Sequence, residues 1–389
     1  MIARNRPIIS LFLAHMVTDL YMPVITAILP LLIYTRGYSY LMAGLLVTSY
    51  NLTSSAAQPV FGWLSDRRGL QVPIAVSLLV SAIFIGLIGV IEPYPLLLIC
   101  AAAAALGHAC FHPQALTMVS RIATNVNRGR LTAFFVVGGN VGYAIGPILA
   151  SAIVVRFGLP GLPLLILPAL FIAIAMRNLV PRVEASSVPS QDSPDIPLRL
   201  STFQPVFTLF ASATLRAWAV FAAITFFPPL LVERGLDLFS ANLCITLMLL
   251  AGVTGQITGG TLADRYGKKE FVLLGLALSL PSFLVFYLAS GTLSLVALLI
   301  FGFTLWSSFA LTVAISHELM PGHVGMTSGL MLGVAIGAGG LGVALTGYIA
   351  DQYSLQSALA TIPALIAGAA LLMTMVRYPG KSVAGSRGS

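Results

Sequence analysis

Gly62-Trp63-Leu64-Ser65-Asp66-Arg67-Arg68-Gly69 is a charged stretch between two long apolar runs. A second copy, Gly260-Thr261-Leu262-Ala263-Asp264-Arg265-Tyr266-Gly267, begins 198 positions later, about half the length of this 389-residue chain. Recurrence at half the length indicates two tandem copies of one structural unit. Either each stretch is a basic turn that only marks the cytoplasmic side of a membrane, or it takes part in conformational change. The repeat favours the second interpretation. The residues concerned are Gly62, Asp66, Arg67, Gly69, Asp264 and Arg265.

The composition of the chain excludes an ordinary soluble protein. Hydrophobic residues make up 58% and charged residues 8%, whereas soluble globular domains carry about 25% charged residues. The mean hydropathy is +0.97. Apolar runs of about 18 residues or more, each long enough to cross a bilayer as a helix, recur along the chain. We therefore predict an all-α integral membrane protein.

Twelve membrane spans in two pseudo-symmetric six-helix bundles are expected. The predicted spans are about 8–30, 40–63, 71–91, 95–120, 131–155, 161–180, 204–232, 240–262, 271–289, 292–318, 325–349 and 355–376. The segment 181–203 is rich in proline and serine, which is the composition of a flexible linker. It divides the chain into an N-terminal bundle over 1–180 and a C-terminal bundle with a short tail over 204–389.

The distribution of basic residues predicts the orientation. With both termini in the cytoplasm, sixteen of the 20 Lys and Arg residues face that side and three face outside. Cytoplasmic loops of membrane proteins are enriched in these residues. The same bias accounts for the net charge of +8 without a nucleic-acid partner. We expect a multi-pass protein of the cytoplasmic membrane, without a cleavable signal peptide because its first apolar run is too long for one.

Ionisable side chains near the middle of a span are costly in lipid and are therefore functional candidates. Asp19 lies about midway along the first span, with His15 one turn before it on the same face. Arg216 lies about midway along the seventh span, 197 positions after Asp19, so the two occupy near-equivalent places in the repeat. Either they form a fixed buried ion pair between the halves, or they belong to a divided site around one cavity.

Span four carries His108 and His112, one helical turn apart, followed by Gln114. Three interpretations stay open: hydrogen-bonded core residues, a metal site, or groups that line a cavity and carry protons near neutral pH. No carboxylate or thiolate completes a metal set within this motif, and the three cysteines show no metal-ligand spacing. We therefore expect no metal, and we favour a cavity lining because His15 on another span has the same character.

Three further candidates lie in the second half. Glu318, at the end of span ten, is either a gate residue or an ordinary interfacial acid. Trp218 and Trp306 are candidates for stacking on a substrate, although packing is the commoner role of such residues. No Gly-rich phosphate loop followed by Lys-Ser/Thr is present, and no Ser or Cys nucleophile has a base at a recognisable spacing. We thus predict neither an enzyme nor a cofactor.

Span five presents glycines four residues apart on one helical face, where a neighbouring helix can approach closely. The residues of this motif are Gly138, Asn140, Gly142, Gly146 and Pro147. Proline removes a backbone donor and can bend the helix. The motif is therefore either a close-packing surface or a bendable helix at the interface between the halves.

These features resemble the major facilitator superfamily along the whole chain, through the twelve spans, the repeated Gly-x-x-x-Asp-Arg-x-Gly stretch and the Gly-x-x-x-Gly-Pro of span five. A narrower set of motifs resembles the fosmidomycin-resistance branch of that superfamily. The motifs are His15-x-x-x-Asp19, Gln58-Pro59-Val60-x-Gly62, Phe111-His112-Pro113, Val137-Gly138-Gly139-Asn140 and Glu318-Leu319-Met320-Pro321-Gly322-x-Val324-Gly325-Met326.

The resemblance implies that spans one, four, seven and ten line a central cavity about which the two halves rock. It implies a proton-coupled antiporter that exports drugs such as fosmidomycin. The branch commonly has an acid at the position of Gln114, so proton coupling falls here to Asp19 or Glu318, assisted by His112, or the coupling differs. The expected substrate-binding residues are His15, His108, His112, Gln114, Arg216, Trp218 and Trp306.

Two other functions stay open at this point. One is a proton symporter that imports a small anion bound by Arg216. The other is a membrane receptor or sensor that transports nothing. For a transporter we expect a monomer in the lipid bilayer, with a small-molecule substrate and with the proton gradient as its energy source in place of a cofactor.

Overall fold

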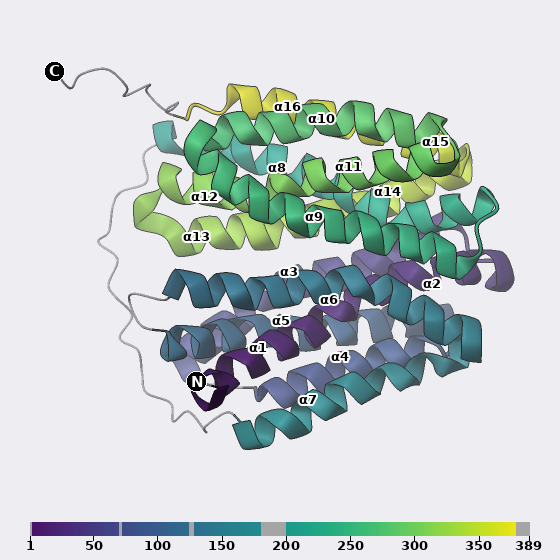
Figure 1. Cartoon of the computed structure of the whole chain (residues 1–389), viewed down its shortest axis with the longest axis horizontal. Helices are drawn as coiled ribbons and strands as arrows, with labels where there is room; N and C mark the ends of the chain where they lie inside the picture. The colour runs from purple at the N-terminus through teal and green to yellow at the C-terminus, as the bar shows by residue number, and fades with distance from the viewer. Residues whose placement is uncertain (1, 70–71, 124–127, 180–199, 379–389) are drawn as a thin grey trace. The chain divides into compact units, whose positions relative to one another are not determined.

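The computed structural model describes residues 2–69, 72–123, 128–179 and 200–378. Within those ranges the chain forms helices and no β-strand (Figure 1). The elements are α1 (Ile2–Leu20), α2 (Met22–Arg36), α3 (Tyr40–Arg68), α4 (Ile74–Ile88), α5 (Tyr94–Ile122), α6 (Arg128–Phe157), the 3₁₀-helix η1 (Leu159–Leu165), α7 (Ile166–Leu179), α8 (Leu200–Glu233), α9 (Leu238–Tyr266), α10 (Lys268–Leu288), α11 (Gly291–Ser307), α12 (Phe309–Leu319), the 3₁₀-helix η2 (Pro321–His323), α13 (Val324–Ser328), the π-helix η3 (Gly329–Val334), α14 (Ala335–Gln352), α15 (Leu355–Leu359) and α16 (Ile362–Met375).

Ten helical segments of the described residues are long and apolar enough to cross a membrane. The helix α4 is apolar but only 15 residues long. Each predicted span coincides with one helix or with consecutive helices, as α1 and α2 do for the first span and α11 and α12 for the tenth. The all-α membrane fold is therefore confirmed, whereas the number of twelve spans stays a prediction.

The chain forms two compact units, and each is described by itself. Unit 1 comprises Met1–Ser190, Phe221–Thr246 and Gly340–Leu359, and unit 2 comprises the remaining segments. The helices α8, α9 and α14 thus contribute a part to each unit. The predicted bundles follow the sequence repeat and stay a prediction. The predicted linker lies outside the described residues up to residue 199, and α8 already begins at Leu200.

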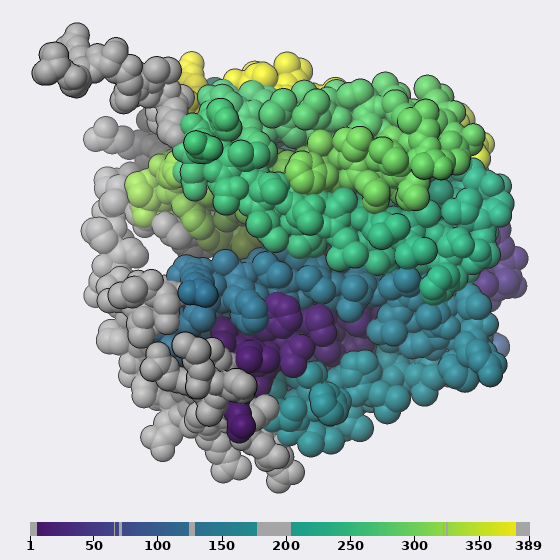
Figure 2. Space-filling model, viewed as in Figure 1, coloured from purple at the N-terminus to yellow at the C-terminus, as the bar shows by residue number. Residues whose placement is uncertain are grey.

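In unit 1, α6 packs closely against α1 because it presents glycines to that helix. A Cβ at Gly138 or Gly146 would lie 2.6 Å from a backbone carbonyl oxygen of α1, and one at Gly142 would overlap another. The motif of span five therefore includes a close-packing surface. Asn140 and Pro147 lie on the same helix, and bending at this proline stays a prediction. Figure 2 shows atoms of α1, in purple, between those of neighbouring helices of unit 1.

Glu233, at the end of α8, joins segments of unit 1 that lie far apart in the sequence. Its carboxylate accepts hydrogen bonds from the hydroxyls of Tyr34 and Tyr40, at 3.0 and 2.6 Å. It also accepts one from the side-chain amide of Gln356, at 2.9 Å. The ends of α2, α3, α8 and α15 are therefore held together by one carboxylate with three neutral donors.

Asp351 of α14 caps the N-terminus of α3. Its carboxylate accepts hydrogen bonds from the backbone N–H groups of Tyr40 and Leu41, at 2.7 and 2.9 Å. The first N–H groups of a helix have no partner within the helix itself. The next of them, that of Met42, donates to the hydroxyl of Ser39 at 3.2 Å. The start of α3 is thus fixed both locally and by a residue 311 positions away.

The two repeated stretches are helix ends rather than loops along their length. The first continues α3 to Arg68 and turns only at Gly69, whose φ is +63° and whose N–H donates to carbonyls of the last turn. The second ends α9 and turns at Gly267, whose φ is +103°. Such left-handed backbone favours glycine. The side chain of Asp66 lies outside the described residues, and Arg67, Asp264 and Arg265 are exposed.

Candidate functional site

The first membrane-crossing segment is broken just after Asp19. Pro23 has no N–H, so the carbonyl of Asp19 lacks its usual donor four residues further on. The backbone bends at Tyr21, whose hydroxyl donates to the carbonyl of Leu165 at 2.9 Å. The break leaves Asp19 and His15 in the last turns of α1.

Four titratable side chains from two helices meet in unit 1. On α1, Nε2 of His15 lies 3.1 Å from Oδ2 of Asp19. From α5, the Nε2 atoms of His108 and His112 lie 3.4 and 3.6 Å from Oδ1 of Asp19 and 3.0 Å from each other. We call these four residues the histidine–aspartate cluster. Their side chains are 8% to 18% exposed, so the cluster is largely buried but not closed off. The sequence predicted all four residues as candidates.

The helix α6 holds His15 in place. The imidazole stacks on the ring of Phe135, with centroids 4.1 Å apart, and Nδ1 donates to the carbonyl oxygen of Phe135 at 2.8 Å. One turn further along α6, Gly139 faces the cluster. A methyl group at that position would overlap Nε2 of His15 and Oδ2 of Asp19. The absent side chain of Gly139 therefore makes room for the contact between the two.

The helix α3 orients His108. The hydroxyl oxygen of Ser54 lies 2.9 Å from Nδ1 of His108, and the side-chain amide of Gln58 donates to that same oxygen at 3.1 Å. The ring of Tyr50 lies 5.7 Å from the imidazole of His108, between centroids. Sequence reasoning assigned no role to Ser54, Gln58 or Gly139. Gln58 and Gly139 belong to two of the motifs that resemble the fosmidomycin-resistance branch, and this membership was the signal that could have identified them.

The cluster also bears on the prediction of no metal. His15, Asp19 and His112 bring ligand atoms within 4.8 Å of one another, as a metal site would require. The missing carboxylate of the histidine motif is therefore supplied by the fold. Nε2 of each histidine also lies within hydrogen-bonding distance of Asp19 or of another imidazole. The expectation that no metal binds here stays a prediction.

Arg216 lies in unit 2, on α8. Its side chain is buried, and its Cζ lies 5.1 Å from the centroid of the Phe309 ring, a cation–π contact. Among the described residues of that unit it forms no ion pair, and its Nε has no hydrogen-bond partner. Because Asp19 belongs to unit 1, the predicted pairing of Arg216 with Asp19 stays a prediction.

The other predicted site residues are not part of the cluster contacts described above. Glu318 forms an ion pair with Lys268 and accepts a hydrogen bond from the hydroxyl of Tyr378. These partners favour an interfacial role that ties α12 to the start of α10. Trp306 packs on Gly252 of α9. Trp218 is half-buried on α8, and Gln114 is half-buried on α5, two residues beyond His112.

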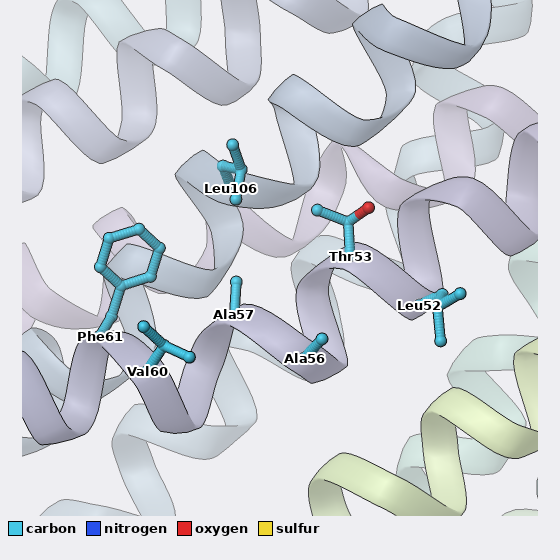
Figure 3. A pocket seen from close by; sticks show the side chains of 7 residues that line it. All are labelled: Leu52, Thr53, Ala56, Ala57, Val60, Phe61 and Leu106. Carbon is cyan, nitrogen blue, oxygen red and sulfur yellow. The ribbon is translucent and has the colours of Figure 1, made fainter.

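A shallow groove lies on another face of α3. Its volume is about 450 Å³ (Figure 3). Thr53 is the one polar residue of its lining. The lining residues are Leu52, Thr53, Ala56, Ala57, Val60, Phe61 and Leu106. No member of the histidine–aspartate cluster lines it, so the groove is separate from the candidate site.

The chain matches a protein-family model and several known proteins. The model of the Major Facilitator Superfamily matches residues 8–340 and 209–388. The fosmidomycin resistance protein of Escherichia coli (strain K12) is 29% identical over 356 residues, which cover 89% of this chain and 87% of that protein. The uncharacterised MFS-type transporter YfnC of Bacillus subtilis (strain 168) is 29% identical over 372 residues, covering 92% and 90%.

A solved structure resembles the fold. The crystal structure of a bacterial homologue of the human lysosomal transporter Spinster, in an inward-facing and occupied conformation, has a TM-score of 0.81 and 16% identity to this chain, with 97% of both chains covered. At that identity the likeness concerns the fold alone. With the family model matching nearly the whole chain, the protein belongs to the Major Facilitator Superfamily and is a multi-pass membrane transporter.

Proposed function

We propose that this transporter exports small molecules in exchange for protons, as a drug/proton antiporter of the cytoplasmic membrane with both termini inside. The observation that carries the proposal is the histidine–aspartate cluster. Its carboxylate, on α1, lies within 3.6 Å of three imidazoles in an apolar helical segment. Ionisable groups within a membrane are rare and mark proton and substrate pathways. Asp19 binds the exchanged proton, and substrate and proton compete for it.

The charge of the substrate decides the sign of coupling at this cluster. Exchange requires that substrate binding favours the deprotonated cluster. A hydrogen-bond donor or a positive group beside Asp19 has this effect because it stabilises the ionised carboxylate. An anionic group in the same place would favour protonation and would give symport instead. An antiported drug must therefore present a donor or a cation to Asp19.

A drug as cargo is supported by the relative named fosmidomycin resistance protein. Fosmidomycin is therefore the first probe. The transport cycle is one of alternating access. The repeated stretches around Asp66 and Asp264 act at the cytoplasmic side. The proton gradient supplies the energy, so no cofactor is required. The alternative of a receptor or sensor is disfavoured by membership of a superfamily of transporters.

Transport into reconstituted vesicles tests the proposal. A pH gradient of either sign is imposed, and the accumulation of labelled fosmidomycin is measured. We expect accumulation on the side from which protons leave, and its loss in Asp19→Asn. The matched control is Asp237→Asn, which neutralises an exposed carboxylate at the start of α9. Accumulation that follows the protons in the same direction would contradict antiport.

A second candidate function rests on Arg216. A buried guanidinium that forms no ion pair with the described residues of its unit is suited to an anionic substrate. This observation favours a proton symporter for a small organic anion. In the same vesicles, symport predicts accumulation along the proton gradient and its loss in Arg216→Gln, whereas Arg216→Lys retains part of it because the charge remains.

A further inference from the structure

The hydrogen-bond partners of His15 determine how many protons it shares with Asp19. Nδ1 of His15 lies 2.8 Å from the carbonyl oxygen of Phe135, which can only accept, so Nδ1 carries a hydrogen. Nε2 lies 3.1 Å from Oδ2 of Asp19. Either Nε2–H donates to the ionised carboxylate, or a protonated Asp19 donates to Nε2. In both cases the pair holds one exchangeable proton between these two atoms.

The partners of His108 determine the state of the second pair. The oxygen of Ser54 accepts from Gln58 at 3.1 Å, and its own hydroxyl hydrogen can be donated to Nδ1 of His108, 2.9 Å away. A neutral His108 that accepts at Nδ1 must carry its hydrogen on Nε2. That hydrogen faces Nε2 of His112 at 3.0 Å, where only a lone pair can receive it. In this arrangement His112 carries its hydrogen on Nδ1 and has a lone pair on Nε2.

A second exchangeable proton has a defined place in this arrangement. The lone pair on Nε2 of His112 is the acceptor. Once that atom is protonated, two N–H groups would face each other across 3.0 Å, so the contact with His108 must break. Oδ1 of Asp19 lies 3.6 Å from the same Nε2 and 3.4 Å from Nε2 of His108. The imidazolium of His112 thus has a carboxylate oxygen beside it.

We propose, building on the proton-coupled function above, that the cluster stores two exchangeable protons, the first between His15 and Asp19 and the second on His112 facing Oδ1 of Asp19. Ser54 and Gln58 are positioning residues, because they fix the tautomer of His108 that keeps His112 neutral and ready. Among the described residues, the phenols of Tyr50 on α3 and Tyr143 on α6 also face the cluster. Phenols stay neutral near pH 7. One transport cycle can therefore exchange up to two protons.

Solid-state ¹⁵N NMR of the histidine-labelled protein in liposomes tests this without any substrate. The chain has 5 histidines, so single His→Gln variants assign each signal. Above about pH 8, where free imidazole is neutral, we expect hydrogen on Nδ1 of His15, on Nε2 of His108 and on Nδ1 of His112. As the pH falls, we expect His112 to become doubly protonated.

The Ser54→Ala variant tests the positioning role. Without the hydroxyl, His108 gains a population with hydrogen on Nδ1. Its free Nε2 can then accept from protonated His112, so His112 takes up its proton at a higher pH than in the wild type. Ser54→Thr keeps the hydroxyl and restores the wild-type spectrum. Ser49→Ala is the matched control, because it removes a similar α3–α5 hydrogen bond, to the carbonyl of Leu98 at 3.1 Å, and leaves the histidine signals unchanged.

The proposal is overturned by hydrogen on Nδ1 of His108 in the wild type, by a His112 that never becomes doubly protonated before the protein unfolds, or by an unchanged His108 in Ser54→Ala. Its failure is distinct from failure of the proposed function. A protein that exports no drug can still give the expected spectra, and a working antiporter with a single stored proton gives spectra that contradict them.

Discussion

At the scale of single residues, the candidate site requires a residue without a side chain at Gly139. We predict that Gly139→Ala separates His15 from Asp19, because the added methyl group overlaps atoms of both. Forcing an extra methyl group into a packed site costs about 1–3 kcal/mol. Gradient-driven transport in vesicles should fall to background, with a lower thermal unfolding temperature.

The matched control for that variant is Gly129→Ala. This glycine lies near the start of the same helix, and a Cβ there meets nothing within 4 Å. It should transport as the wild type does. Equal transport by both variants would mean that the contact between His15 and Asp19 is not required.

The sequence identified the cluster residues but not their supports. Asp19, His15, His108 and His112 stand out because ionisable groups are unusual in apolar runs. Ser54 does not stand out, since a serine in a helix commonly bonds to its own backbone. Only the packing of α3 beside α5 directs its hydroxyl to His108. The role of Ser54 thus depends on the helix that packs beside α3, and the sequence does not specify which helix that is.

At the scale of elements, the cap of α3 is supplied from α14. We predict that Asp351→Ala lowers the free energy of unfolding by about 1 kcal/mol, the usual cost of a lost helix cap. Two N–H groups, of Tyr40 and Leu41, lose their partner. Thermal unfolding of the detergent-solubilised protein measures the change. Asp351→Asn keeps an acceptor oxygen and should lose less, and an unfolding temperature equal to that of the wild type in both variants would refute the role.

A local cap at the start of α9 gives a pH-dependent prediction. Hydrogen bonds from the hydroxyl and the backbone N–H of Ser240 lower the pKa of Asp237. The stability that this cap contributes is therefore complete above the unfolded pKa of about 3.9 and is lost as the pH falls through the lower folded pKa. Unfolding temperatures of the wild type and Asp237→Asn should differ near pH 7 and converge at low pH. A difference that grows on acidification would contradict this sign.

Helix positions could largely be predicted, and helix interruptions could not. Apolar runs mark each helical segment, yet the break at Tyr21 falls inside a single predicted span. Pro23 gave a signal for it, but proline at a helix start and proline within a bent helix look alike in a sequence. The repeated charged stretches continue their helices, and only their last glycines turn, at positive φ.

At the scale of the whole molecule, the repeat predicts two related bundles, and that division stays a prediction. Segments 221–246 and 340–359 belong to unit 1 together with the N-terminal helices. Glu233 and Asp351, which make its long-range hydrogen bonds, lie in those two segments. Hydrophobic periodicity specifies that a helix forms, but it does not specify which of its ends packs on which partner.

Competition between substrate and proton at Asp19 can be measured as the proton release of purified, detergent-solubilised protein on addition of fosmidomycin and a panel of cationic and anionic drugs. A pH-sensitive dye in weakly buffered solution reports it, and thermal shift reports binding independently. We expect release by the wild type and by Asp237→Asn, and none by Asp19→Asn. Binding accompanied by proton uptake, or by no proton change in the wild type, would contradict competition between substrate and proton at Asp19.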